Sequence, residues 1–172
     1  MIIVLMGVAG SGKTTIGELL AVDLKWQFFD GDDFHSSESL NKMKQGIALN
    51  DSDRKPWLDR LQNLIGKADR QGSNIIIACS ALKKSYRDYL QKDHTEVIFV
   101  HLQGDFSLIL KRLEQRAGHF YKAALLPSQF AELEEPADAL TINVATAPSA
   151  IVQFIKSRLK ITAVTERNLS LP

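Results

Sequence analysis

The sequence predicts an α/β fold in which a parallel β-sheet carries helices on both faces, and three observations support this. Apolar runs and helical patterns alternate along the chain in the order βαβαβα. Two inner runs, NIIIA at 74–78 and VIFVHL at 97–102, are apolar almost throughout, as expected of strands buried on both faces. The first strand leads directly into a glycine-rich turn. A sheet of this kind places ligand-binding loops at the carboxyl ends of its strands.

The expected elements follow one another without a linker or an internal repeat. We expect strands at Ile2–Met6, Gln27–Asp30, Asn74–Ala78, Val97–Leu102 and Leu140–Val144. We expect helices at Thr15–Lys25, Ser37–Gln45, Asp53–Gln71, Ser85–Lys92, Phe106–Arg116 and Pro148–Leu159. Residues 1–160 are therefore interpreted as one domain. Residues 161–172 form a polar tail to which we assign no element, and disorder stays open for it.

The opening stretch MIIVLMGVAGSGKTT contains the pattern GxxxxGKT directly after a strand. Its glycines can adopt backbone angles closed to other residues, so that consecutive N–H groups can surround an anion. Lys13 is expected at the outer phosphates of a nucleotide, and the Thr14 hydroxyl at Mg²⁺. A glycine-rich turn without a ligand is the alternative, and the match at all eight positions argues against it. The nucleotide-binding residues are predicted to be Gly7, Ala9, Gly10, Ser11, Gly12, Lys13, Thr14 and Thr15.

Composition restricts the classes of partner. The chain has 172 residues, 45% of them hydrophobic, which suits a single globular domain. A net charge of +1 gives no basic surface for nucleic acid, and no apolar run suits a membrane span. The opening residues lack the basic region and cleavage site of a signal peptide. The single cysteine, Cys79, excludes an internal disulfide and is expected to be a buried structural thiol, so we expect a cytoplasmic protein.

Three carboxylates follow the second strand in the stretch FFDGDDFH, with Gly31 expected to allow a sharp turn between the first two. Phosphoryl transfer requires one carboxylate near the metal and another that positions the attacking hydroxyl and accepts its proton. We assign Asp30 to the metal and Asp32 to the acceptor. The alternative is an acidic turn that caps the following helix, for which Asp33 is the candidate.

Several blocks of the sequence, taken together, resemble the gluconate kinase family, which is built on the nucleoside-monophosphate-kinase scaffold. These blocks are GVAGSGKTT, DGDDFH, NKMKQGIALNDSDRKPWL, ACSALKKSYRDYL and HFYKAALLPSQFAELEEP. The resemblance covers roughly residues 2–160. It implies a P-loop NTPase fold with a helical lid at about residues 112–130. It also implies ATP- and Mg²⁺-dependent phosphorylation of D-gluconate at its 6-hydroxyl, and commonly a homodimer.

The same resemblance implies roles on the acceptor side. Asp32 would orient the 6-hydroxyl, and His35 would lie near the sugar. Arg54 and Arg87 are expected to clamp the gluconate carboxylate, because a planar guanidinium binds a carboxylate through two hydrogen bonds. The alternative for each arginine is a surface ion pair, such as Arg54 with Asp53.

The lid segment contributes four further candidates. Arg112 and Arg116 lie four residues apart, so on a helix they share a face, and the resemblance directs them to the transferring phosphate or to adenine. An exposed helix without that role is the alternative. His119 and Gln129 lie in the segment most typical of the family, and Gln129 is expected to help build or close the substrate pocket.

Some positions depart from the family pattern, and other functions stay open. Phe34 and Ser36 stand where leucine and proline are more usual, and Tyr121 and Lys122 replace an apolar residue and proline, which bears on acceptor selectivity. A shikimate-kinase-like or other small-acid kinase is the main alternative. A nucleotide-dependent switch or a binding module with a relic P-loop is less favoured, because the DxxG match at 69–72 lies in a helical stretch.

Overall fold

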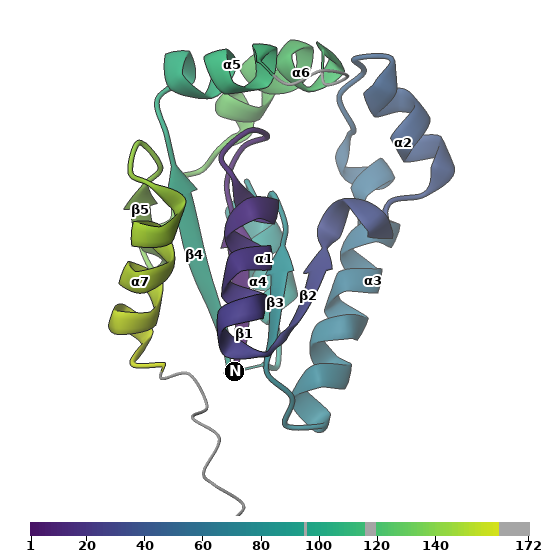
Figure 1. The fold of residues 1–172 in the computed structure, drawn as a ribbon. Coiled ribbons are helices and arrows are strands. Elements are labelled where there is room, and N and C mark those ends of the chain that lie inside the picture. The colour runs from purple at the N-terminus through teal and green to yellow at the C-terminus, as the bar shows by residue number, and fades with distance from the viewer. Residues whose placement is uncertain (95, 116–119, 162–172) are drawn as a thin grey trace, which may run out of the picture.

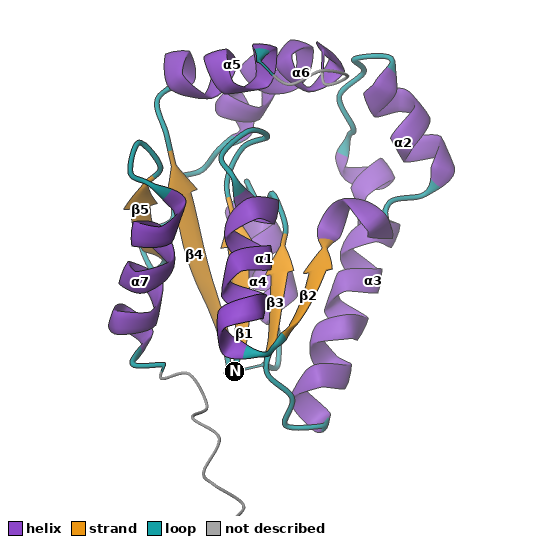
Figure 2. Ribbon diagram, in the orientation of Figure 1, coloured by secondary structure: helices purple, strands orange, loops and turns teal. Residues whose placement is uncertain are grey.

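A computed structural model describes residues 1–94, 96–115 and 120–161, apart from the side chains of residues 120–122. One sheet of five parallel strands runs through the centre in the order β2-β3-β1-β4-β5 (Figures 1 and 2). The strands are β1 (Ile2–Met6), β2 (Gln27–Asp30), β3 (Ile75–Ala78), β4 (Val97–Gln103) and β5 (Leu140–Asn143). The predicted parallel α/β fold is therefore confirmed.

The first strand occupies the middle of the sheet, paired with β3 on one side and β4 on the other. All five of its residues are buried, and they alternate between two hydrophobic cores. Ile3 and Leu5 belong to the core on one face, and Ile2, Val4 and Met6 belong to the core on the other. The continuous apolar run thus reflects burial on both faces.

The helices form a layer on each face of the sheet and a third group at its carboxyl edge (Figure 1). Helices α1 (Lys13–Leu24) and α7 (Pro148–Leu159) pack on one face, and α3 (Asp51–Arg70) and α4 (Lys84–Gln91) pack on the other. Helices α5 (Phe106–Glu114) and α6 (Phe120–Glu132) lie across the carboxyl ends of the strands, and α2 (Ser37–Lys44) stands beside them. The described part of the expected lid corresponds to the end of α5 and most of α6.

The helix boundaries differ from the predicted ones where a cap decides them. Helix α3 begins at Asp51, before the predicted start at Asp53, because Asn50 and Asp53 form a capping box. The alternative, in which Asp33 caps the next helix, is not what the structure shows. Ser36 caps α2 by accepting a hydrogen bond from the Ser39 N–H, and residues Gly31–Phe34 form a short 3₁₀ turn instead.

In the described part of the chain, no helix is both long and apolar enough to cross a bilayer.

Candidate active site

The glycine-rich loop lies between β1 and α1, at the carboxyl end of the central strand. Gly7, Gly10 and Gly12 have φ angles of 134°, 82° and 97°, in the region that favours glycine. A Cβ atom on Gly10 would lie 2.8 Å from the Leu113 side chain of α5. The loop therefore requires glycine both for its turn and for the close approach of α5.

Lys13 bonds back to carbonyl groups of the glycine-rich loop, and Thr14 bonds to the end of the second strand. Lys13 Nζ donates to the carbonyl oxygens of Gly7 and Val8, both at 2.9 Å. Thr14 Oγ1 donates to Asp30 Oδ2 at 2.8 Å. The other oxygen of Asp30 accepts the Asp32 N–H at 3.0 Å. Thr14 of α1 and Asp30 of β2, the two residues predicted to bind Mg²⁺, are therefore in direct contact.

The turn after β2 is fixed by Trp57 of α3. Its indole Nε1 donates to the Gly31 carbonyl at 2.7 Å, and its ring stacks on His35 with a centroid distance of 4.6 Å. A Cβ atom on Gly31 would lie 2.4 Å from the Ala78 carbonyl, so close packing against β3 explains this glycine. Trp57 thus supports the site through contacts on both sides of the turn.

His35 is largely removed from solvent, and its Nδ1 has no hydrogen-bond partner among the residues that the structure describes. Burial lowers the pKa of His35 below its ordinary value of 6.5. Arg54 and Arg60 lower this pKa further, whereas Asp32 raises it. The ring is therefore neutral near pH 7 and can exchange hydrogen bonds with hydroxyl groups in the cavity.

Arg54 projects from α3 into the same cavity. Its Nη1 donates to Tyr86 Oη at 3.0 Å, and its Nη2 lies 2.8 Å from Glu132 Oε2 of α6. Burial disfavours the charged guanidinium, but the contacts with Glu132 and Tyr86 outweigh it and raise the pKa of Arg54. The expected alternative partner, Asp53, instead pairs with Lys42 at 2.7 Å.

Gln129 of α6 reaches back to the glycine-rich loop. Its Oε1 accepts a hydrogen bond from the Ala9 N–H at 2.7 Å, across 120 residues of sequence. The second half of the lid segment is therefore attached to the predicted nucleotide-binding loop.

One cavity brings most of the predicted residues together. The predicted residues that line it are Ala9, Gly10, Gly12, Lys13, Thr14, Thr15, Asp30, Asp32, His35, Arg54 and Gln129. Sequence reasoning assigned no role to Met43, Lys44 and Ala48, which line the cavity from α2 and the loop after it. The signal was present in the block NKMKQGIALN, but side-chain direction could not be inferred from it. Gly7 and Ser11 shape the loop without lining this cavity.

The structure does not place Arg87 at the cavity. The residue is buried, and its Nη1 donates to the carbonyl oxygens of Ala81 and Leu82 at 3.1 and 2.9 Å. The guanidinium stabilises the loop after β3, which carries the cavity residues Ser80 and Leu82. The expected carboxylate clamp at Arg87 is therefore replaced by a structural role.

Arg112 lines a neighbouring cavity on the other side of the glycine-rich loop, together with Gly12, Thr15, Thr146 and Pro148. Its Nη2 donates to the Val144 carbonyl at 2.7 Å, which ties α5 to the end of β5. Arg116 and His119 lie outside the described residues.

Two other titratable residues, Cys79 and His101, do not line this cavity. Burial raises the pKa of the Cys79 thiol to about 12, so this residue is the expected structural thiol. His101 is buried on β4, and its Nδ1 has no hydrogen-bond partner in the described part of the chain, although Glu135 Oε2 lies 3.5 Å away. In the same residues, no group of three or more His, Cys, Asp or Glu side chains is placed to hold a metal.

Comparisons with known proteins agree with this geometry. A family model described as shikimate kinase matches residues 9–156. The chain is 50% identical over 133 residues to the thermosensitive gluconokinase of Escherichia coli (strain K12), covering 77% of this chain and 71% of that one.

Two solved structures are similar over nearly the whole chain. A sugar kinase from Janibacter sp. HTCC2649 has a TM-score of 0.88 and 39% identity, covering 95% of this chain and 98% of that one. A gluconokinase from Sinorhizobium meliloti 1021 has a TM-score of 0.82 and 38% identity, covering 92% of this chain and 90% of that one.

Proposed function

The chain belongs to the gluconokinase family of shikimate-kinase-type P-loop domains, and from this premise we propose the reaction that it catalyses. It transfers the terminal phosphoryl group of ATP to the 6-hydroxyl of D-gluconate, which gives 6-phosphogluconate and ADP. The single observation that carries this proposal is the shared cavity. The residues of the glycine-rich loop line it together with Asp32, His35 and Arg54, so a nucleotide phosphate and an anionic acceptor can meet there.

The glycine-rich loop holds the phosphates in this proposal. Lys13 exchanges its bonds to the Gly7 and Val8 carbonyls for phosphate oxygens, and the N–H groups at the start of α1 face the same charge. Thr14 and Asp30 fit Mg²⁺, because this ion binds to proteins through one or two oxygen side chains and takes its other ligands from phosphate and water. Bound there, Mg²⁺ neutralises negative charge on the phosphates.

Asp32 acts on the acceptor hydroxyl. Asp32 lines the cavity together with Asp30, whose own oxygens are engaged by Thr14 and by the Asp32 N–H. Asp32 orients the 6-hydroxyl and takes its proton as the oxygen attacks the terminal phosphorus. The leaving oxygen stays with ADP.

The rest of the acceptor contacts come from three elements. Arg54 binds the carboxylate of gluconate, the neutral ring of His35 contacts a hydroxyl group, and Gln129 closes the pocket from the lid. Arg112 serves the nucleotide from the neighbouring cavity. From the family resemblance we extend the proposal to Arg116 near the transferring phosphate and to His119 near the acceptor.

The family resemblance also supports a homodimer in the cytoplasm, acting on a small molecule rather than on nucleic acid or membranes. The buried single cysteine suits a reducing compartment. Light scattering coupled to size-exclusion chromatography measures the assembly. A mass of one chain at micromolar concentration would contradict the dimer.

Shikimate is the second candidate acceptor, because the matching family model bears that description. The test is ADP release from ATP and Mg²⁺ with D-gluconate, L-idonate, shikimate, glycerate or no acceptor. Turnover that depends on D-gluconate supports the proposal. Turnover with shikimate alone would favour the second candidate and would implicate the departures at Phe34 and Ser36. Hydrolysis without an acceptor would contradict both.

A further inference from the structure

Glu132 is the carboxylate that accompanies the proposed acceptor-binding arginine. It lies on the last turn of α6, with Oε2 2.8 Å from Arg54 Nη2. Both side chains are largely buried, at 25% and 13% exposure. Glu132 Oε2 makes this ion pair without a well-aligned hydrogen bond. The contact is therefore electrostatic and can be exchanged for a better-aligned carboxylate.

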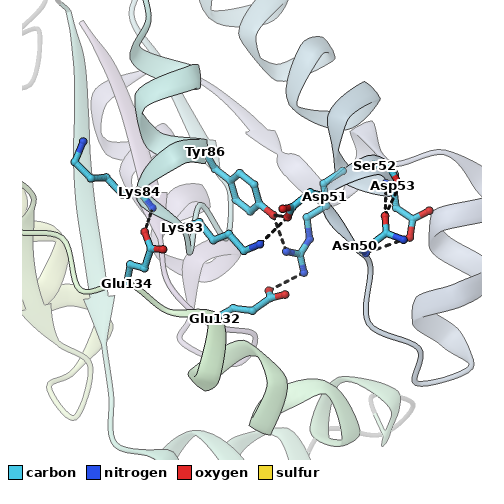
Figure 3. A network of polar contacts seen from close by, with 10 residues as sticks. Asn50, Asp51, Ser52, Asp53, Lys83, Lys84, Tyr86, Glu132 and Glu134 are labelled. Carbon is cyan, nitrogen blue, oxygen red and sulfur yellow. Dashed lines mark hydrogen bonds and ion pairs between the residues drawn. The ribbon is translucent and has the colours of Figure 1, made fainter.

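Two ion pairs belong to this network, Lys83 with Asp51 and Arg54 with Glu132, and Figure 3 labels Asp51, Lys83 and Glu132. Lys83 donates to Asp51 at 2.6 Å, and Tyr86 Oη donates to the same Asp51 oxygen. Asp51 is thus neutralised by Lys83, which leaves Glu132 as the carboxylate that balances Arg54. One guanidinium has five N–H donors, and Tyr86 and Glu132 each occupy a terminal nitrogen.

Helix α6, which carries Glu132, also contacts the glycine-rich loop. Gln129, three residues before Glu132, accepts the Ala9 N–H, so the two side chains share a face of α6. Beyond the helix, the Glu134 carboxylate accepts the Lys84 N–H and leaves Arg54 untouched. The chain therefore provides a matched pair of carboxylates two residues apart, of which one faces Arg54.

We propose that Glu132 is a positioning residue that acts through Arg54: it is the internal counter-ion with which the acceptor carboxylate competes for the guanidinium. This inference rests on the proposed function, in which Arg54 binds that carboxylate. Glu132 orients the Arg54 guanidinium in the free enzyme, and it weakens acceptor binding because the acceptor carboxylate must displace Glu132 or share the guanidinium with it. The sequence alone gave no sign of this role, because Glu132 lies 78 positions from Arg54.

The test measures binding of D-gluconate by calorimetry to the full chain and to Glu132→Gln and Glu134→Gln. Glu132→Gln keeps the shape and removes the competing charge, so it is expected to bind gluconate about two- to fivefold more tightly, the worth of one partly exposed ion pair. Glu134→Gln is expected to bind as the unmodified chain does. Glu132→Asp, with the charge withdrawn by one methylene, is expected to fall between.

Two further measurements separate this role from a structural one. D-gluconamide carries no carboxylate, so Glu132→Gln is expected to leave its affinity unchanged. In an Arg54→Gln background, the Glu132→Gln substitution is expected to lose its effect, as in a double-mutant cycle. A folded Glu132→Gln protein that binds gluconate equally or more weakly would overturn the inference. A wild-type chain that turns over another acid and does not bind gluconate would overturn the proposed function itself.

Discussion

Asp32 and Asp33 are adjacent carboxylates in different surroundings, and on this difference we propose different roles for them. Both are exposed in the short turn after β2, but only Asp32 lines the cavity that the glycine-rich loop shares. The preceding Asp30 is already engaged by Thr14 and by the Asp32 N–H. Because it lines the cavity, Asp32 is the residue that we propose to face the acceptor hydroxyl, and Asp33 serves as a control one position away.

Asp32→Asn is expected to lower kcat by on the order of 100-fold or more, because an amide cannot accept the proton of the hydroxyl. Asp33→Asn is expected to keep most of kcat. Both variants should keep the melting temperature, since both side chains are exposed. Steady-state ADP release provides kcat, and a thermal melt checks the fold. Near-normal turnover in Asp32→Asn would reduce this residue to a positioning group.

Two histidines are expected to make stability depend on pH. Burial lowers the pKa of His35 and of His101 below the ordinary 6.5. Glu135 opposes this shift at His101 and Arg87 adds to it. In the unfolded chain both rings take up protons first as the pH falls. The contribution of the two neutral rings to the free energy of unfolding is therefore fully present above pH 6.5. It is lost as the pH falls through the lowered pKa values of the folded state.

The measurement is the melting temperature between about pH 7.5 and about pH 5.5. The unmodified chain is expected to melt at lower temperature on the acid side. His101→Gln should flatten this dependence, because glutamine does not titrate, and His35→Gln should flatten it separately. An unchanged slope in both variants would assign the acid sensitivity to other groups.

The start of α3 carries two site residues, Arg54 and Trp57, in its first two turns. Asn50 accepts the Asp53 N–H at 2.9 Å, and Asp53 Oδ2 accepts the Asn50 N–H at 3.1 Å. Pro56 lies inside this helix, in its second turn, where it removes the N–H that would otherwise donate to the Ser52 carbonyl. The cap therefore fixes where both side chains enter the cavity.

Asn50→Ala is expected to cost about 1 kcal/mol of unfolding free energy, the usual worth of an N-cap. For a domain of this size the melting temperature should fall by about 2–4 °C. The KM for gluconate should rise more than kcat falls, because Arg54 and Trp57 lose their fixed approach. Ser36→Ala removes the cap of α2 and serves as the comparison. If Asn50→Ala lowered the stability but left the KM for gluconate unchanged, the cap would not be what positions Arg54 and Trp57.

The three inner strands, β3, β1 and β4, could be predicted from the sequence because burial on both faces leaves a strong apolar signal. The five strands begin and end within one or two residues of the predicted positions. The glycine-rich loop was equally clear, since its chemistry is contained in eight consecutive residues. Helix starts were less clear, because a cap such as Asn50 depends on local hydrogen bonds that many polar residues can form.

The contacts that the sequence did not reveal are those between distant elements. Arg54 and Arg87 are both arginines in family-like blocks, yet one enters the cavity and the other is buried under a loop. Likewise, nothing local distinguishes Glu132, which meets Arg54, from Glu134, which meets Lys84. Spacing along a chain constrains which face a side chain takes, but it does not determine which element lies opposite.

Helix α7 completes the core on the α1 face of the sheet, and this determines how much of the chain the fold needs. Ile151, Val152 and Ile155 of this helix are buried in the core on the α1 face, and Lys156 forms an ion pair with Asp23 of α1. Ile161, just beyond the helix, still packs against that core, and its N–H donates to the Lys156 carbonyl at 2.9 Å. The proposed domain therefore closes at about this residue.

A chain that stops after Ile161 is expected to keep the melting temperature, kcat and KM of the full chain, because every core and cavity contact described above lies before that point. A chain that stops after Val144 loses the three buried side chains of α7 and uncovers one face of the sheet. Since each large side chain removed from a core costs about 2–5 kcal/mol, this shorter chain should not fold. Thermal melts and ADP release on both truncations make the comparison. If the chain that ends at Ile161 lost activity while its melting temperature stayed unchanged, residues 162–172 would have a part in the reaction.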